Sequence, residues 1–191
     1  MFYHLIENFI TKDECEFLIK KGVSQGLVEM KSSKIVGGTL YEQNTSDTKN
    51  NKRKGTYFIN ETLMNQEFVK LSNKILDTVN GLKIYNGIEY NGIPKYSFNE
   101  YSPGDFLTWH KDSHEILGGA TITLIIQLND NYDDGEIKFI IDDVENIVPK
   151  KQGSIFIFDS NIEHCVSKLK DGKRYSMNVW PSKKLLKRGM I

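Results

Sequence analysis

The chain has 191 residues, of which 39% are hydrophobic, and it carries 25 basic and 25 acidic side chains. This length and composition are typical of one globular domain with a sizeable core, so we expect a single domain over residues 1–191. The zero net charge excludes a general nucleic-acid or membrane-surface binder, because such proteins carry an excess of basic side chains.

Targeting signals and cysteine usage indicate the compartment. No apolar run approaches the roughly 18 residues of a membrane-spanning helix. The N-terminal stretch MFYHLIENFI lacks the basic start and small-residue cleavage site of a signal peptide. Cys15 and Cys165 are too few for a disulfide framework and lack the paired spacing of a zinc site. We therefore expect an intracellular, cytoplasmic protein with free thiols and no membrane partner.

The N-terminal part, residues 1–82, is predicted to provide helical support and an exposed loop. Thr11 and Glu14 have capping-box spacing before the amphipathic start of a helix within residues 10–26. Residues 42–55, EQNTSDTKNNKRKG, contain almost no apolar side chain and predict an exposed loop, either simply solvated or acting as a lid. A second helix is predicted from Asn60 to Gly81, covering one face of a sheet. Its apolar residues near helical spacing are Leu63, Phe68, Leu71, Ile75 and Val79.

Residues 83–182 have a sequence pattern typical of a β-sandwich or jelly roll, in which short predicted strands are separated by turn-forming residues. The overall prediction is an α+β, mostly β fold. The predicted strands are KYSFNEY (95–101), ATITLIIQL (120–128), EIKFII (136–141), SIFIF (154–158) and RYSMNVW (174–180). The predicted turns are SPGD (102–105), NDNYDDGE (129–136), PKKQG (149–153) and KDGK (170–173).

Two predicted strands carry polar side chains on one face. In RYSMNVW, alternation places Arg174, Ser176, Asn178 and Trp180 on one side. In KYSFNEY, it places Ser97, Asn99 and Tyr101 together. These polar faces are either solvent-exposed, which would make Arg174 a surface cation, or directed at a site.

A possible metal site involves His110, Asp112 and His164. The first two lie in FLTWHKDSH, where residues two apart in a strand project from the same face. Two imidazoles and a carboxylate can form the facial triad that holds non-haem Fe(II) and leaves three coordination positions open. By itself, His-x-Asp with a distant His is a weak pattern.

From about Asn99 to Trp180, the sequence resembles the prolyl-4-hydroxylase-like branch of the Fe(II)/2-oxoglutarate-dependent dioxygenases. Five segments resemble family motifs in order. They are YSPGDFLTWHKD (101–112), LIIQLND (124–130), DDGEIKF (133–139), PKKQGSIFIF (149–158) and HCVSKLKDGKRYSMNVW (164–180). The resemblance implies a double-stranded β-helix, or jelly-roll, core. It also implies hydroxylation coupled to oxidative decarboxylation of 2-oxoglutarate to succinate, with dioxygen consumed and ascorbate as a reductant.

The resemblance also assigns the site. His110, Asp112 and His164 would ligate Fe(II), and Arg174 would pair with the distal carboxylate of 2-oxoglutarate. Tyr101 would hydrogen-bond that carboxylate. Thr123 and Trp180 match positions that line the same pocket. No catalytic residue is expected beyond these metal and co-substrate ligands.

The sequence departs from the family at Ala120, where many relatives carry Arg, and in DDGEIKF, where a paired glycine is common. Both departures bear on the peptide-binding side. Three functions therefore stay open: a hydroxylase of a protein or peptide residue such as proline; the same chemistry on a free amino acid, small metabolite or modified nucleobase; and a metal-binding module without turnover.

The remaining polar residues receive simpler interpretations. His114 is expected to be a neighbouring surface or pocket-rim residue, and His4 a structural one. Asp142 and Asp143 are predicted to lie in a solvated turn. Cys165 is expected to pack as a small hydrophobic residue beside His164.

Overall fold

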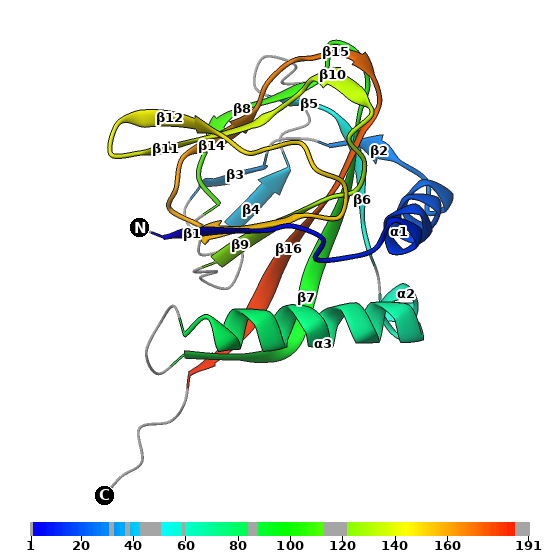
Figure 1. Cartoon of the computed structure of the whole chain (residues 1–191), viewed down its shortest axis with the longest axis vertical. Helices are drawn as coiled ribbons and strands as arrows, with labels where there is room; N and C mark the ends of the chain where they lie inside the picture. The colour runs from blue at the N-terminus through cyan, green and yellow to red at the C-terminus, as the bar shows by residue number, and fades with distance from the viewer. Residues whose placement is uncertain are drawn as a thin grey trace, which may run out of the picture.

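The computed structural model describes residues 2–30, 33–36, 39–42, 51–58, 60–83, 88–112 and 122–185. Figure 1 shows two β-sheets facing each other, with α3 packed beneath the larger sheet on the side away from the smaller one. This arrangement confirms the predicted mostly β, jelly-roll fold. The whole segment 43–50, His114 and Ala120 lie outside the described residues.

The larger sheet, as described, has seven strands in the order β1-β13-β9-β16-β7-β6-β2. These strands pair in antiparallel orientation, and the longest pairing joins β16 to β7 from Arg174↔Tyr101 to Leu185↔Ile88. The strands are β1 (Tyr3–Ile6), β2 (Val28–Glu29), β6 (Lys54–Tyr57), β7 (Ile88–Tyr101), β9 (Ile122–Gln127), β13 (Ile155–Asp159) and β16 (Arg174–Leu185).

The smaller sheet has five strands within the described ranges, in the order β12-β11-β14-β8-β5. They are β5 (Asn51–Lys52), β8 (Phe106–His110), β11 (Ile137–Ile141), β12 (Val144–Ile147) and β14 (His164–Val166). Two further antiparallel pairs complete the described strands. They are β3 (Ser33–Val36) with β4 (Thr39–Glu42), and β10 (Tyr132–Asp134) with β15 (Leu169–Gly172).

Helix α1 (Lys12–Ser24) begins as predicted. Thr11 is its N-cap, and the side chains of Thr11 and Glu14 bind each other's backbone N–H groups in a capping box. A Cβ atom added to Gly22 would lie 2.3 Å from Cγ of Phe98 on β7. Glycine at this position therefore allows the helix to approach the sheet closely.

The predicted helix over residues 60–81 is two helices, which corrects the expectation of a continuous one. Helix α2 (Asn60–Leu63) ends before α3 (Gln66–Gly81), because Asn65 takes an extended conformation and caps α3 by accepting a hydrogen bond from Glu67 N. The four predicted apolar residues within α3 are buried against the sheet, namely Phe68, Leu71, Ile75 and Val79.

The two faces of the larger sheet have different surroundings. Met177 and Val179 of β16 face the helices and belong to the core cluster that includes α1 and α3 residues. Arg174, Ser176 and Trp180 lie on the opposite face and are also buried, so this polar face is not a solvent surface.

A second cluster fills the space between the sheets. It contains Tyr101, Ile125, Tyr132, Ile137, Phe139, Val148, Phe156, Phe158, Ile162, Val166 and Leu169.

Three segments predicted as loops or turns contain strands. Residues 51–55, expected in the exposed loop, contribute β5 to the smaller sheet and the start of β6 to the larger one. Asn51 and Gly55 are buried. The predicted turns at 129–136 and 170–173 contain β10 and most of β15, which pair with each other. In each case the partner strand, rather than local sequence periodicity, stabilises the extended conformation.

The predicted turns at 102–105 and 149–153 are confirmed. Asp105 N donates to Ser102 O at 2.8 Å, and the Asp105 carboxylate accepts from Ser102 N at 2.9 Å. Gly153 has φ +79°, and a Cβ atom there would lie 2.3 Å from the carbonyl oxygen of Ile10. A glycine is therefore required where the 149–153 turn meets the N-terminal segment.

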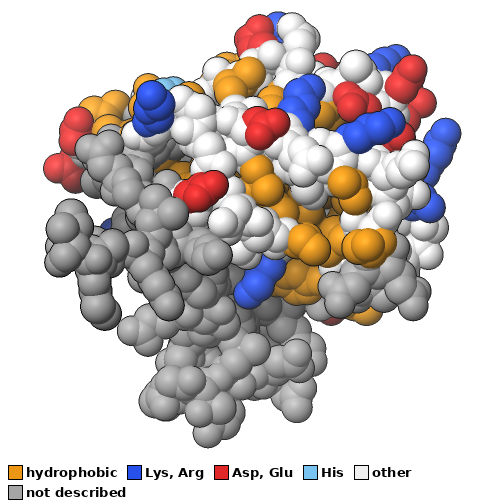
Figure 2. Space-filling model, turned by 90° about the horizontal axis from the view of Figure 1, so that it is seen from below, with side chains coloured by type: hydrophobic (Ala, Val, Ile, Leu, Met, Phe, Trp, Pro, Cys, Tyr) orange, Lys and Arg blue, Asp and Glu red, His pale blue; other side chains and the backbone are white. Residues whose placement is uncertain are grey.

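The lower surface of the molecule carries exposed apolar residues. Seen from below, hydrophobic side chains gather near the middle of this surface (Figure 2). Met64, just before α3, is 71% exposed, and Val69, in the first turn of α3, is 42% exposed. Among the described helices, none has both the length and the hydropathy required to cross a membrane.

Candidate metal and co-substrate site

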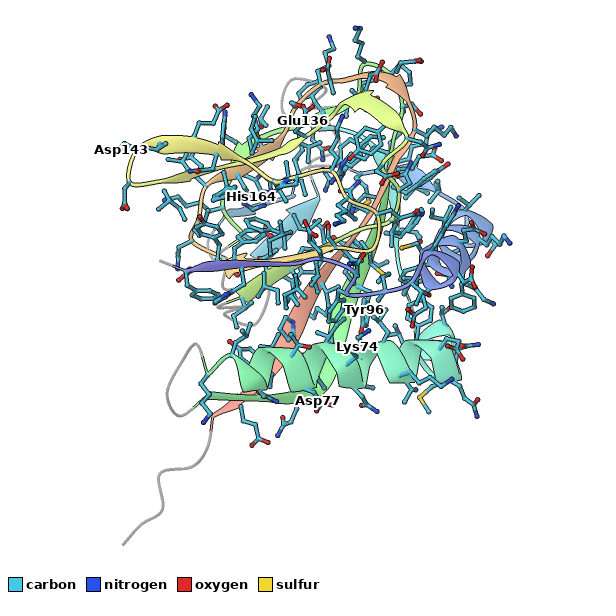
Figure 3. All side chains as sticks on the ribbon, viewed as in Figure 1. Lys74, Asp77, Tyr96, Glu136, Asp143 and His164 are labelled. Atoms are coloured by element: carbon cyan, nitrogen blue, oxygen red, sulfur yellow. The ribbon has the colours of Figure 1, made fainter. Side chains whose placement is uncertain are left out.

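The candidate metal site lies where β8 and β14 pair. His164 at the start of β14 is the direct cross-strand partner of His110 at the end of β8, and their ring centroids are 4.2 Å apart. Asp112 follows β8, and its backbone N–H donates to Ser160 O at 3.0 Å. Figure 3 shows His164 between the two sheets, whereas Asp143 lies at the far tip of the β11–β12 hairpin.

Backbone carbonyls orient both imidazoles. His110 Nδ1 lies 2.8 Å from Thr108 O, and His164 Nδ1 lies 3.0 Å from Ile162 O. A carbonyl oxygen can only accept, so each Nδ1 carries the proton and each Nε2 keeps a free lone pair. Such hydrogen bonds to the second ring nitrogen are typical of metal-binding histidines.

The three potential ligand atoms converge. Asp112 Oδ1 is 3.4 Å from His110 Nε2, Asp112 Oδ2 is 3.9 Å from His164 Nε2, and ligand atoms of the three residues lie within 4.8 Å of one another. These separations are short enough for the three residues to be candidates for holding one ion together. Two imidazole nitrogens and a carboxylate are a donor set suited to Fe(II), and three protein ligands leave positions open for other molecules.

The protonation states also suit a divalent cation. Burial alone raises the pKa of Asp112, but its interactions with the neighbouring His110 and His164 outweigh this effect and hold the pKa well below its usual range. Burial lowers the pKa of His164 to about 4, although the Asp112 carboxylate opposes the change. At neutral pH, His164 is therefore neutral and Asp112 is ionised, as metal ligands must be.

Side chains from two strands of the larger sheet hold the Asp112 carboxylate. Thr123 Oγ1 on β9 donates to Asp112 Oδ2 at 3.0 Å, and Trp180 Nε1 on β16 donates to the same oxygen at 3.2 Å. Ser160 Oγ lies 3.0 Å from Thr123 Oγ1, so Ser160 donates when the Thr123 proton is directed at Asp112. Oδ2 thus has two donors, while Oδ1 faces His110.

Arg174 is buried without an anionic partner. Its side chain is 1% exposed. Nη1 donates to Ser176 Oγ at 3.0 Å, and Nη2 donates to Gln127 Oε1 at 3.3 Å. Within the described part of the chain, Nε is buried with no hydrogen-bond partner, and no carboxylate forms an ion pair with Arg174.

A buried guanidinium without a counter-ion is costly, which indicates a place for an anionic ligand. Tyr101, the cross-strand partner of Arg174, places its ring centroid 5.0 Å from the guanidinium carbon. The interpretation of Arg174 as a surface cation is therefore wrong. The structure brings Arg174 and Tyr101 together as expected.

Sequence reasoning missed several polar residues around the site. Gln127 is 5% exposed and donates through Nε2 to Asn129 O and Tyr132 Oη, both at 2.7 Å. It shares a strand face with Thr123, so alternation along residues 120–128 contained a usable signal. Ser160 lies in a turn between strands, where no periodicity could have indicated it.

The structure also places the other polar residues that the sequence singled out, where it describes them. His4 is exposed on β1. Asp142 and Asp143 have φ of 50° and 61°, lie between β11 and β12, and are exposed. Cys15 and Cys165 are free and buried, and burial raises the pKa of each thiol to about 11.

Comparison with known proteins identifies the segment that contains the site. Residues 96–182 match the model of the 2OG-Fe(II) oxygenase superfamily. These residues include His110, Asp112, His164 and Arg174. No curated protein matches this sequence at a significant level.

Solved structures share the fold over nearly the whole chain. A Pseudomonas putida prolyl-4-hydroxylase is 17% identical, with a TM-score of 0.70 over 95% of this chain and 92% of that one. A viral collagen prolyl hydroxylase from Paramecium Bursaria Chlorella virus-1, in complex with 2OG, is 18% identical, with a TM-score of 0.66 over 95% and 96%. A Trichoplax adhaerens prolyl hydroxylase bound to a hypoxia inducible factor peptide fragment is 17% identical, with a TM-score of 0.73 over 94% and 82%.

Proposed function

We propose, from the premise that residues 96–182 belong to the 2OG-Fe(II) oxygenase superfamily, that this dioxygenase hydroxylates a residue of a protein or peptide, with proline as the preferred candidate. The cofactors are Fe(II) and 2-oxoglutarate, and dioxygen is the oxidant. Bound iron supplies the activation of dioxygen that couples 2-oxoglutarate decarboxylation to substrate hydroxylation. We also propose that ascorbate serves as a reductant.

In this proposal, Nε2 of His110, Nε2 of His164 and Oδ1 of Asp112 would hold the metal. Thr123 and Trp180 would act as positioning residues, because their hydrogen bonds occupy Oδ2 and fix the carboxylate plane. This arrangement favours a single carboxylate oxygen as the ligand, which preserves coordination positions for the co-substrate.

The observation that carries the proposal is the buried guanidinium of Arg174 without a carboxylate partner in the described structure. A planar guanidinium can donate two parallel hydrogen bonds to one carboxylate. Arg174 would therefore bind the distal carboxylate of 2-oxoglutarate. Tyr101, stacked near the guanidinium, would donate its hydroxyl proton to the same group.

The choice of a peptide substrate is supported by the solved structures. The three fold relatives named above are prolyl hydroxylases, and the Trichoplax adhaerens protein is complexed with a peptide fragment. At 17–18% identity these relatives share the fold, so the substrate itself requires a direct test.

The test is a panel of proline-containing peptides and free amino acids incubated with Fe(II), 2-oxoglutarate and ascorbate. Mass spectrometry would detect the gain of one oxygen atom, and succinate would be quantified in parallel. Hydroxylation of a peptide at proline, coupled to succinate, is the expected result. Hydroxylation confined to free amino acids would contradict the peptide assignment, and absence of succinate under every condition would contradict the oxygenase assignment.

A further inference from the structure

Arg53 lies where the chain passes from one sheet to the other. Residues 51–52 pair with β8 of the smaller sheet, and residues 54–57 pair with β7 of the larger sheet. Arg53 is the single residue between these strands. Its side chain reaches the strand face that also carries Tyr101, because Arg53 Nε donates to Asn99 Oδ1 at 2.9 Å.

Two buried amides fix the Arg53 guanidinium. Besides the bond to Asn99, Nη1 donates to Asn51 Oδ1 at 2.6 Å. Both asparagines are held in turn: Asn51 Nδ2 donates to Met30 O at 3.0 Å, and Asn99 Nδ2 donates to Ser97 O at 3.2 Å. Asn51 and Asn99 are 8% and 1% exposed. This network orients a cation at considerable cost in side-chain entropy.

The network leaves part of Arg53 available. In the described residues, Nη2 has no hydrogen-bond partner, and Arg53 forms no ion pair with a carboxylate. Among the described residues, the buried side-chain nitrogen or oxygen atom that lacks a hydrogen-bond partner is Arg174 Nε. Arg53 Nη2 also lacks a partner among them but is not in that buried class, so it is accessible to solvent or to a ligand. Its neighbour Lys52 differs, because Lys52 pairs with Asp105 at 3.3 Å.

Asn178 connects Arg53 to the candidate site. Asn99 Nδ2 lies 3.4 Å from Asn178 Oδ1 on β16. Asn178 is on the same strand face as Arg174 and Trp180, between the residue proposed to bind 2-oxoglutarate and the residue that donates to Asp112. The Arg53–Asn99–Asn178 chain therefore runs along the interior wall that holds the site. This wall is polar rather than apolar.

We propose that Arg53 binds a carboxylate of the primary substrate, so that the preferred substrate carries an acidic group near the hydroxylated carbon. This inference rests on the proposed oxygenase function, in which Arg174 binds the co-substrate and leaves the second cation for the substrate. The acidic group is either an Asp or Glu side chain next to the target residue in a peptide, or the α-carboxylate of a free amino acid.

The experiment compares matched probes. The first pair is a short, terminally blocked proline peptide flanked by Asp and Glu, and the same peptide with Asn and Gln. The second pair is L-proline and L-prolinamide. Binding of each probe to the anaerobic complex with Fe(II) and 2-oxoglutarate is measured by calorimetry for wild type, Arg53→Gln, Arg53→Lys and Lys54→Gln. Lys54 is an exposed cation one residue away, so its variant controls for net charge.

Within at least one pair, wild type should bind the acidic probe about 10- to 100-fold more tightly than its amide, the range for hydrogen bonds to charged groups. The pair in which the acidic probe binds more tightly identifies the source of the carboxylate: an acidic side chain of a peptide, or the α-carboxylate of a free amino acid. Arg53→Gln should remove the preference, Arg53→Lys should retain part of it, and Lys54→Gln should retain it fully. Affinity for 2-oxoglutarate should be equal in all four proteins, which also shows that each variant is folded.

Three results would overturn the inference. The first is that wild type binds the acidic probe and its amide equally in both pairs. The second is that Arg53→Gln still prefers the acidic probe. The third is that Arg53→Gln loses affinity for 2-oxoglutarate although thermal unfolding shows an intact fold. Failure of the proposed function is distinguishable, because it would remove 2-oxoglutarate binding and succinate formation from wild type itself.

Discussion

His110 and His164 are direct cross-strand partners, and each donates its Nδ1 proton to the carbonyl two residues before it. Both Nε2 lone pairs therefore face the Asp112 carboxylate. Backbone geometry alone would give two neighbouring imidazoles many other orientations. The carbonyls of Thr108 and Ile162 fix the observed one, in which the three side chains could hold one cation, so the candidate metal site is the first target for mutagenesis.

Replacing His110, Asp112 or His164 singly with Ala should weaken Fe(II) binding by more than the 10- to 100-fold loss typical of residues that only support a ligand. The change removes one of three donor atoms, while most of the apolar core stays intact. Anaerobic metal titration measures the effect, and His4→Ala is the matched control because His4 is exposed on β1. Any of the three variants with wild-type Fe(II) affinity would show that its residue is not a ligand.

Thr123→Val and Trp180→Phe should each lower Fe(II) affinity by about 10- to 100-fold, because each removes one donor from Asp112 Oδ2. Thr123→Ser should restore most of the affinity, since it keeps the hydroxyl. Trp109→Phe is the control, because Trp109 is 36% exposed and donates no hydrogen bond to Asp112 in the described structure. Unchanged Fe(II) affinity in both Thr123→Val and Trp180→Phe would exclude a positioning role.

Gly22→Ala should lower the free energy of unfolding, whereas Gly81→Ala should not. In Gly22→Ala, overlap with the Phe98 ring should cost about 1–3 kcal/mol and outweigh the roughly 1 kcal/mol gained in helix propensity. Apart from its chain neighbours and the backbone of its own helix, no heavy atom lies within 4 Å of a Cβ added at Gly81, so Gly81→Ala should be neutral or stabilising. Urea denaturation measures the free energy of unfolding of both variants and of wild type. A stabilising Gly22→Ala would contradict the close packing of α1 on β7.

Tyr96 provides a pH-dependent test of the interface between α3 and the sheet (Figure 3). Burial raises the pKa of Tyr96 to about 12, although its hydrogen bond with Ser72 opposes the change. Between pH 10 and 12, the unfolded chain releases this proton before the folded one does, so the stability due to neutral Tyr96 declines as pH rises through this range.

Tyr96→Phe should therefore be less stable than wild type by about 1 kcal/mol at neutral pH, where only the Ser72 hydrogen bond is lost. The difference should narrow or reverse above pH 10. Urea denaturation of both proteins across this pH range checks the expectation. A difference that stays constant with pH would mean that Tyr96 ionises equally in the folded and unfolded states.

Strand alternation in the sequence predicted the polar faces of β7 and β16, because two long strands in one sheet keep a period of two. Local capping chemistry predicted the start of α1. The break at Asn65 was missed, since apolar spacing continues across it and only the cap conformation ends α2. Strands β5, β6, β10 and β15 were missed because short polar strands are specified by their partners.

Some features of the candidate site could be predicted from the sequence, and others could not. Alternation placed Arg174 and Tyr101 on particular faces, while the resemblance supplied their roles. Neither could show that Thr123 and Trp180 donate to Asp112, because that contact depends on how two sheets pack. Arg53 lay in a segment predicted to be an exposed loop, and its position became evident only from the pairing of the flanking strands with β7 and β8.

The central claim is that Arg174 binds the co-substrate beside the metal. Arg174→Ala removes the guanidinium and should cost roughly 2–5 kcal/mol of 2-oxoglutarate binding, or about 30-fold to several thousandfold in affinity. Arg174→Lys should retain only part of the 2-oxoglutarate affinity, because an ammonium group lacks the planar geometry of a guanidinium. Fe(II) affinity without 2-oxoglutarate should stay near the wild-type value in both variants.

The most direct measurement is therefore a titration of 2-oxoglutarate into the anaerobic Fe(II) protein, following the metal-to-ligand charge-transfer absorption. Wild type should develop the band at low 2-oxoglutarate concentration, Arg174→Lys at higher concentration, and Arg174→Ala at the highest. Equal midpoints for wild type and Arg174→Ala would contradict the assignment of Arg174, and absence of the band in wild type would contradict the site as a whole.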